Sequence, residues 1–250
     1  MLQLIAERQF VRVADLSDAF SISDVTVRAD LAALEQSHAV RRVRGGAIAP
    51  HPATRMETAF EVSVGEFAGE KMRIAERAAA MVVPGMSVLL DVGTTTTAIA
   101  RALVERVDLD QVVVITNGLT VALELEPAAG RITVVLTGGT LRHLQHSLVN
   151  PMATVLLERL HADLGFIGCN GVEAEQGITN LNLPEAEVKR SLIAAAGRAV
   201  VVADGSKIGQ VHLGRVARLD EVDSVLTGPS APAQEVARLR RAGLDVVEVE

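Results

Sequence analysis

Five short segments rich in glycine and in hydroxyl or amide side chains are the part of this sequence best suited to bind a small anion. They are Asp91–Thr97, Thr116–Gly118, Thr137–Gly139, Gly168–Gly171 and Asp204–Lys207. Glycine lets a backbone approach a ligand closely, and a helix that begins in such a loop directs amide donors and its positive dipole end at an anion. One loop of this kind is more often structural, because tight turns need glycine. Because five such loops recur in this chain, we predict a phosphate site.

Other ligand chemistries find less support. The Thr94–Thr97 segment lacks the lysine of a nucleotide-binding P-loop and the spacing of a dinucleotide fingerprint. His143 and His146 have no third ligand at metal-binding spacing. Cys169 is the one cysteine, and no histidine that would activate it as a nucleophile is identifiable. We therefore expect no metal and no cofactor.

A second chemical cluster is basic and precedes these loops. Residues 1–46 carry six arginines and six acids, but every charged residue after Glu35 in this stretch is an arginine. Arg41, Arg42 and Arg44 are interspersed with apolar residues ahead of the Gly45–Gly46 pair, which is typical of a basic hairpin. The net charge of the chain is −7, so contact with nucleic acid has to rest on a local patch of this kind.

The residues ahead of the hairpin predict two short helices joined by a tight turn. Val13–Phe20 has apolar residues at helical spacing, and Ser23 is a good N-cap for a second helix over Asp24–Gln36. Four apolar residues of the second helix are expected to face inward: Val25, Val27, Leu31 and Leu34.

Residues 1–50 are thus predicted to form a winged helix-turn-helix that binds double-stranded DNA. In this motif the N-terminal end of the second helix enters the major groove, so Ser23, Thr26 and Arg28 are expected nearest the bases and phosphates. Arg41, Arg42 and Arg44 would hold the DNA backbone. The alternative is a small helical protein-interaction domain with a charged, solvated hairpin.

The rest of the chain has the pattern of a doubly wound, mostly parallel α/β domain over residues 70–250, with residues 51–69 as a linker. Seven apolar runs predict strands: Val88–Asp91, Val112–Ile115, Ile132–Leu136, Leu164–Ile167, Val200–Ala203, Ser224–Leu226 and Val246–Val249. Helical segments separate most of them, which implies a mostly parallel sheet covered on both faces. Ligands bind beyond the carboxyl ends of such strands, where the five loops should converge.

Composition is that of a folded protein, with 49% hydrophobic and 22% charged residues. No apolar run reaches the roughly 18 residues that a membrane span needs, and a signal-peptide pattern is lacking. We expect a cytoplasmic protein, associated with the nucleoid when it is bound to DNA. Tryptophan and tyrosine are absent, so recognition should be polar rather than by aromatic stacking.

Two linked motifs in the N-terminal segment closely resemble the DNA-binding signature of the DeoR family of bacterial regulators. They are Phe20–Leu31, with the sequence FSISDVTVRADL, and Arg41–Ala47, with RRVRGGA. The family usually has a basic residue where Ala29 stands and a histidine where Arg44 stands. Its members also have several more residues ahead of Leu2, so the first helix, expected at Leu2–Glu7, should bury less apolar surface.

The loops of the larger domain resemble the same family's sensor domain, so the likeness covers almost the whole chain. That sensor is related to ribose-5-phosphate isomerases, and the family responds to phosphorylated sugars or related catabolic intermediates. The resemblance implies an effector phosphate near Gly93–Thr96. The candidate effector-binding residues are Asp91, Gly93, Thr94, Thr95, Thr96, Asn117, Gly138, Gly139, Asn170 and Lys207.

These expectations describe a DNA-binding transcriptional regulator that acts as a homo-oligomer, represses a carbohydrate or related catabolic operon and responds to a phosphorylated sugar. The alternative is a sugar-phosphate isomerase-like enzyme, which needs a carboxylate beside the carbonyl. Isomerases of this kind carry an acidic cluster after the fourth strand, where this chain has Gly168–Gly171, with Glu173 and Glu175 beyond it. Glu187 is another candidate base, although a glutamate on a helix face near Lys189 and Arg190 is more often part of a salt-bridged surface. We expect no catalytic residue.

Overall fold

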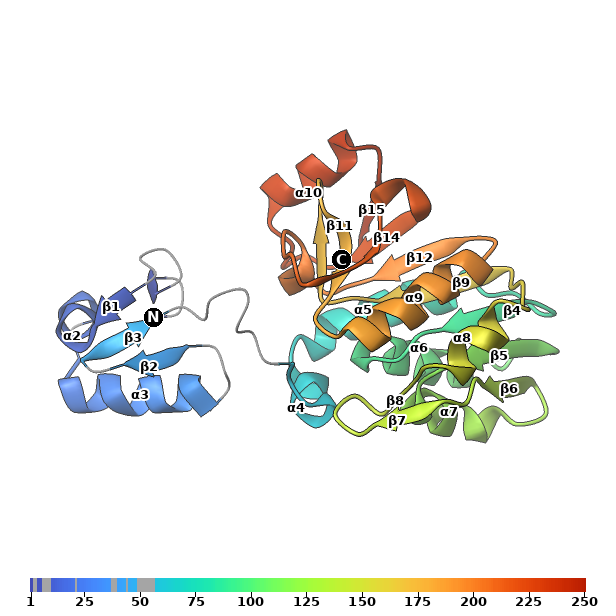
Figure 1. The fold of residues 1–250 in the computed structure, drawn as a ribbon, viewed down its shortest axis with the longest axis horizontal. Coiled ribbons are helices and arrows are strands. Elements are labelled where there is room, and N and C mark those ends of the chain that lie inside the picture. Colours follow the sequence, from blue (N-terminus) through green and yellow to red (C-terminus); the bar gives the residue numbers. More distant parts are fainter. Residues whose placement is uncertain (2–3, 6–9, 21, 37–39, 44, 49–56) are drawn as a thin grey trace. The chain divides into compact units, whose positions relative to one another are not determined.

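The structure of the protein is a computed structural model that describes residues 1, 4–5, 10–20, 22–36, 40–43, 45–48 and 57–250. The chain divides into two compact units, Met1–Thr58 and Ala59–Glu250 (Figure 1).

The N-terminal unit pairs two helices with a small antiparallel sheet. The helices are α2 (Val13–Phe20) and α3 (Asp24–Gln36), with the bounds that the sequence predicts. The strands are β1 (Phe10–Arg12), β2 (Arg41–Val43) and β3 (Gly46–Ile48), in the order β1-β3-β2. The β2–β3 hairpin is the predicted wing. Its Gly45 has a φ of +87°, a backbone conformation that glycine adopts without steric cost.

Two side chains of this unit differ from the sequence prediction. Val25 was expected to face inward, but it is 74% exposed, and Phe20 is 44% exposed. The helix α3 packs through Val27 and Leu31, which are four residues apart and share one face, whereas Val25 lies on the opposite face. Leu4 and Ile5 are helical, but the rest of the predicted first helix lies outside the described residues, as do Arg44 and residues 51–56.

The C-terminal unit is built on a seven-stranded sheet in the order β15-β14-β12-β9-β4-β5-β6. Every neighbouring pair of strands in it is parallel. All seven predicted strands are confirmed: β4 (Ser87–Leu90), β5 (Val112–Thr116), β6 (Ile132–Leu136), β9 (Leu164–Gly168), β12 (Ala199–Val202), β14 (Ser224–Thr227) and β15 (Asp245–Glu248).

Helices cover both faces of this sheet because successive strand residues point to opposite sides. The helices are α4 (Phe60–Gly65), α5 (Ala68–Ala79), α6 (Thr94–Glu105), α7 (Leu119–Leu125), α8 (Met152–Leu157), α9 (Leu183–Ala195) and α10 (Ala233–Arg241). On one face, α5, α6 and α7 pack on Val88, Leu90 and Phe166. On the other, α8, α9 and α10 pack on Leu89 and Ile167. The predicted doubly wound α/β architecture is therefore confirmed.

Several shorter elements were not predicted. They are the antiparallel hairpin β7 (Thr140–Arg142) and β8 (Ser147–Val149), and the antiparallel sheet of β10 (Gly171–Glu173), β11 (Gly177–Asn180) and β13 (Gly214–Ala217). Strands of three or four residues are too short to show a periodic pattern. Helix α4 lies within the stretch expected as a linker. Short 3₁₀ turns lie at Glu126–Ala128, Gly205–Lys207 and Leu219–Glu221.

The connectivity defines where a ligand is expected to bind. From β4 the chain adds β5 and β6 on one side, then returns to add β9, β12, β14 and β15 on the other. The order therefore reverses between β4 and β9, and the crevice beyond the carboxyl ends of strands at such a switch point is the usual ligand site of an open α/β sheet. Within the described residues, no helix is long and apolar enough to cross a membrane.

Candidate functional site

The first turn of α6 lies directly beyond β4, at the switch point of the sheet. The helix begins at Thr94, so most of the threonine segment that was expected to be a loop is helical. Gly93 precedes it with a φ of +141°, and no side chain of the described residues caps the helix there. Its Gly93 carbonyl accepts hydrogen bonds from the Thr96 hydroxyl at 3.0 Å and the Thr97 hydroxyl at 2.7 Å.

These contacts leave the start of α6 suited to an anion. The first amides of a helix have no acceptor within the helix and carry the positive end of its dipole. Thr95 and Thr96 are buried, and the Thr96 hydroxyl holds the turn through the Gly93 carbonyl, whereas Gly93 and Thr94 are partly exposed. A phosphate placed at this end would meet backbone donors on a rigid support.

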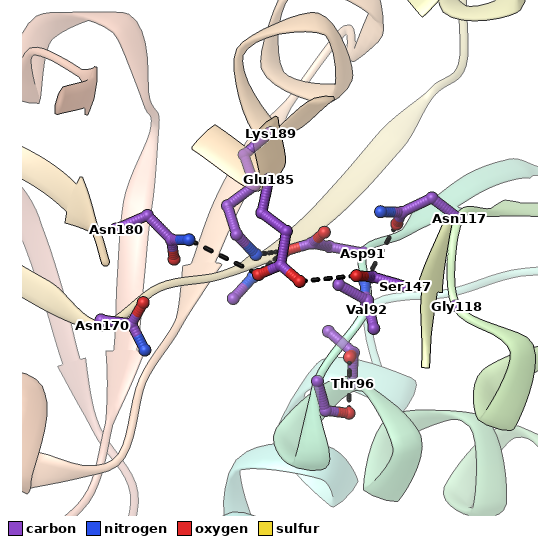
Figure 2. Close-up of polar contacts among 12 residues, drawn as sticks. Asp91, Val92, Thr96, Asn117, Gly118, Ser147, Asn170, Asn180, Glu185 and Lys189 are labelled. Carbon is purple, nitrogen blue, oxygen red and sulfur yellow. Dashed lines mark hydrogen bonds and ion pairs between the residues drawn. The ribbon is translucent and has the colours of Figure 1, made fainter. Parts of the chain in front are cut away.

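A buried ion pair adjoins this turn. Asp91 Oδ2 accepts hydrogen bonds from the ammonium of Lys189 and, at 3.0 Å, from the amide of Gly168 (Figure 2). Asp91 is fully buried and Lys189 is 3% exposed. The pair therefore joins the ends of β4 and β9 to helix α9. The other oxygen, Asp91 Oδ1, is buried and has no hydrogen-bond partner among the described residues.

The surroundings set the charge of this pair. Burial raises the pKa of the Asp91 carboxyl, and the ammonium of Lys189 acts against that rise. Burial alone would lower the pKa of Lys189, but the carboxylates of Asp91 and Glu185 outweigh this effect and hold its pKa above the usual value. Lys189 is accordingly a cation at neutral pH, compensated by the carboxylates around it.

Glu185 is a second buried carboxylate at this edge, and the sequence analysis did not single it out. Its Oε1 accepts hydrogen bonds from Arg142 and, at 2.6 Å, from the Ser147 hydroxyl. Figure 2 shows Glu185 and Lys189 projecting from α9 toward the same region. Their four-residue spacing puts them on one helix face, and Asn182 caps the helix ahead of them. This spacing after an N-cap is the sequence signal by which the pair could have been found.

Asn117 lies at the same edge, but its side chain forms hydrogen bonds with the protein backbone. Its Oδ1 accepts a hydrogen bond from the Val92 amide at 3.0 Å, and its Nδ2 donates to the Leu148 carbonyl at 3.4 Å. It thereby joins the turn after β4 to strand β8. Asn117 is fully buried.

The Gly138–Gly139 pair follows β6 and leads into the β7–β8 hairpin. Gly139 has a φ of +124°, and a Cβ at this position would lie 2.3 Å from the Val149 carbonyl oxygen. Gly138 has a φ of +73°, and its Cβ would meet nothing within 4 Å. Close packing against β8 therefore requires glycine at position 139, while position 138 requires only the positive φ.

The remaining predicted residues come from the loops after β9 and β12. Asn170 Oδ1 accepts a hydrogen bond from the Leu181 amide at 2.9 Å. Lys207 ends a short 3₁₀ turn and is partly exposed. Lys71, which the sequence analysis did not single out, is buried and donates to the Ser63 carbonyl at 2.6 Å. Its burial lowers its pKa, and the charge of Lys207 acts in the same direction.

The residues weighed for catalysis have other roles in the structure. Burial raises the pKa of the Cys169 thiol to about 12, so this cysteine is not an activated nucleophile. Glu187 pairs with Arg190 on the exposed face of α9. Glu173 accepts hydrogen bonds from the amides of Glu175 and Gln176 and so closes a turn. Among the described residues, no three histidine, cysteine or acidic side chains are placed to hold a metal ion.

In the N-terminal unit, the predicted DNA-contacting residues gather at the start of α3 and in the hairpin. Ser23 Oγ accepts a hydrogen bond from the Thr26 amide at 3.2 Å, as expected of an N-cap. Thr26 and Arg28 are exposed, with Arg28 lying 3.8 Å from Asp24. Arg42 is exposed beside Glu35. Of Arg41 the structure describes only the backbone, in β2, and Arg44 lies outside the described residues.

Comparison with known proteins identifies the two units. A model of the DeoR-like helix-turn-helix domain matches residues 1–53, and a model of the DeoR C-terminal sensor domain matches residues 66–228. A putative aga operon transcriptional repressor from Escherichia coli O157:H7 is 33% identical over 100% of this chain and 91% of its own length. The HTH-type transcriptional regulator GlpR from Haloferax volcanii is 34% identical over 99% of this chain and 95% of its own.

A more distant relative is the glycerol-3-phosphate regulon repressor of Escherichia coli K12, which is 27% identical over 93% of this chain and 90% of its own. Among solved structures, ribose 5-phosphate isomerase A from Methanocaldococcus jannaschii is 19% identical, covers 57% of this chain and 55% of its own, and has a TM-score of 0.41. The full-length relatives are regulators with a DNA-binding domain rather than enzymes. The chain belongs to the DeoR family of transcriptional regulators, with an N-terminal helix-turn-helix domain and a C-terminal sensor domain.

Proposed function

We propose that this regulator represses an operon for the use of a carbohydrate or a related compound, and that a phosphorylated sugar bound to the sensor domain releases it from the operator. One observation carries the sensor part of this proposal: the uncapped start of α6 at the switch point of the sheet. Backbone donors there suit a phosphate, and the relatives include a repressor named for a glycerol-3-phosphate regulon.

Within the proposed site the residues fall into two groups. Gly93, Thr94 and the first amides of α6 would receive the phosphate, with the Lys207 ammonium as a nearby cation and Gly138 and Asn170 around the rest of the effector. Asp91, Asn117 and Gly139 would act indirectly, because Asp91 Oδ2, the Asn117 amide and the Gly139 backbone are already engaged in holding the turns in place. Thr95 and Thr96, which are buried, would stabilise the first turn of α6 by packing against the protein interior.

On the DNA side, we propose that the start of α3 reads bases in the major groove while Arg42 and its hairpin neighbours hold phosphates. Thr26, Arg28 and the exposed Val25 would face the groove. A single helix and wing cover too few base pairs for site specificity, so the protein would bind as a homo-oligomer to a repeated half-site, in the cytoplasm at the nucleoid.

The phosphate site is best tested with a change that repels anions without weakening the helix. Thr94→Asp places a carboxylate at the N-terminus of α6, where the dipole favours it, so the variant should fold at least as well as the wild type. Thr94→Asn is the neutral isostere. We expect glycerol 3-phosphate, ribose 5-phosphate or another member of a sugar-phosphate panel to raise the melting temperature of the wild type and of Thr94→Asn, but not that of Thr94→Asp.

Two results would contradict the assignment. One is a panel in which no phosphorylated compound shifts the melting temperature of the wild type. The other is an equal shift in Thr94→Asp and Thr94→Asn, which would place the anion away from the start of α6.

A further inference from the structure

The hairpin turn between β7 and β8 connects the proposed effector site to α4, the first element of the sensor unit. Its last residue is His146, which has a φ of +55°. The ring of His146 packs on Phe60 of α4 with centroids 5.2 Å apart, and its Nε2 lies 3.1 Å from Oε1 of Glu61, also in α4. The amide of Phe60 donates to the carbonyl of Leu144 in the same turn at 2.9 Å.

The same residue also contacts the element that follows β5. His146 Nδ1 lies 2.9 Å from the hydroxyl of Thr120, and its carbonyl accepts a hydrogen bond from the Leu119 amide at 3.0 Å. Both partners belong to the first turn of α7, directly after the Thr116–Gly118 loop. One side chain thus bridges α4 and α7.

The residues that follow His146 lead into the proposed effector site. Ser147 is buried and donates to Glu185, which shares the α9 face with Lys189. Leu148 exchanges hydrogen bonds with Asn117, which in turn holds the Val92 amide in the turn before α6. The contacts from Val92 to Phe60 therefore form one unbroken series through buried or partly buried groups.

Helix α4 is where a displacement in this series would reach the DNA-binding unit. The sensor unit begins at Ala59 and α4 at Phe60, so α4 is joined through the chain to the unit that carries α3. We infer that His146 is the positioning residue that couples effector binding at the strand ends to α4 and, through it, to operator affinity. This inference rests on the proposed function, and it assigns His146 no contact with either the effector or the DNA.

Glycine is the substitution that isolates the side chain, because it adopts a positive φ without strain. His146→Gly removes the contacts to Phe60, Glu61 and Thr120 and leaves the turn able to keep its shape. His143→Gly is the matched control, since His143 is an exposed histidine of the same turn. Operator DNA is first selected from a random duplex library with the full-length protein, and the probe is the member of the sugar-phosphate panel that raises the wild-type melting temperature most.

In the wild type and in His143→Gly, a saturating concentration of the probe should change the operator dissociation constant by about 5-fold or more. In His146→Gly, the operator affinity without probe and the melting shift with probe should stay close to wild type, while the change in operator affinity should fall below about 2-fold. Hydrogen exchange gives a readout without DNA: the probe should alter amide protection in residues 60–65 of the wild type but not of His146→Gly.

The outcomes separate the two proposals. Retention of the full probe effect in His146→Gly overturns the coupling role alone. Loss of operator binding or of the melting shift in this variant also overturns it, because His146 would then be needed for folding or for one of the sites. Absence of any probe effect in the wild type overturns the proposed function, and with it the inference.

Discussion

Lys189 and Arg190 are adjacent on α9, and each forms an ion pair with a carboxylate. The Lys189 pair is buried and the Arg190 pair is exposed, so removing either residue should change stability by very different amounts. Lys189 neutralises a carboxylate that is fully buried, whereas Arg190 pairs with Glu187 in solvent. Removing one partner of a buried pair leaves an uncompensated charge, while an exposed pair is screened by water. Comparing variants of Lys189 and Arg190 therefore measures how much burial adds to the energy of the Asp91–Lys189 ion pair.

We expect Lys189→Met to lower the free energy of unfolding by about 3–5 kcal/mol, because Asp91 is left buried without its cation and must either stay charged or take up a proton, both at a cost. Arg190→Met should cost at most about 1 kcal/mol. Urea unfolding followed by circular dichroism measures both. Equal small losses in the two variants would show that water reaches Asp91 and that the pair is not buried as described.

Cys169 gives a second expectation at the residue scale. The thiolate is the form that reacts with alkylating reagents, and burial raises the pKa of this thiol to about 12. Iodoacetamide at pH 8 should therefore label the folded protein at least about 100-fold more slowly than the protein unfolded in urea. The rate in the folded protein should keep rising with pH beyond the usual thiol range. Equal labelling of the folded and unfolded forms would contradict the raised pKa of this thiol.

Val25 shows what residue patterns alone did not predict. Its apolar character suggested a core position, but packing of α3 on Val27 and Leu31 leaves it on the exposed face. An exposed apolar side chain at the start of a recognition helix is suited to contact a thymine methyl group. Replacing successive thymines of the operator by uracil should weaken wild-type binding at one position by about 1 kcal/mol, and Val25→Ala should lose this sensitivity at that position. Undiminished sensitivity in Val25→Ala would rule out the contact.

At the scale of elements, long periodic segments could be predicted and short ones could not. The seven sheet strands and the bounds of α2 and α3 follow from apolar runs and spacing. The β7–β8 hairpin escaped prediction because its three-residue strands are held by tertiary contacts, such as those of Leu148 with Asn117, rather than by local pattern. Glu185 was missed for the same reason, since its partners on the hairpin are far away in the sequence.

The hairpin also sets a test at this scale. Gly139→Ala would combine an unfavourable φ with a Cβ only 2.3 Å from the Val149 carbonyl oxygen. Gly138→Ala has the unfavourable φ alone. We expect Gly138→Ala to cost about 1–2 kcal/mol and Gly139→Ala clearly more, as measured by thermal or urea unfolding. A Gly139→Ala variant as stable as Gly138→Ala would contradict the close approach of the two strands.

At the scale of the whole molecule, one chain carries both a helix-turn-helix domain and a sensor domain. The sequence motifs and the family match agree on a DNA-binding unit and a sensor unit, and the strand order places the loops after β4 and β9 on either side of the switch point. Which side chains are free to meet an effector depended on burial and hydrogen bonding. Asn117, for example, had the right type and place but is occupied by Val92 and Leu148.

Thermodynamic linkage makes the proposed coupling between sugar-phosphate binding and operator binding measurable. If a sugar phosphate and the operator act on one equilibrium, each must change the affinity for the other by the same factor. The DNA side has its own signature: Arg28→Ala and Arg42→Ala should each weaken operator binding and lower the slope of log affinity against log salt by about 1. An unchanged slope in both variants would remove these arginines from the interface.

The most direct test of the account is fluorescence anisotropy of labelled operator DNA titrated with the full-length protein, with and without the sugar phosphate that raises its melting temperature. We expect saturating sugar phosphate to raise the operator dissociation constant of the wild type by a factor of about 5–150. Thr94→Asp should abolish this change, while Thr94→Asn should keep it. An operator dissociation constant that is the same with and without a bound sugar phosphate would contradict the account.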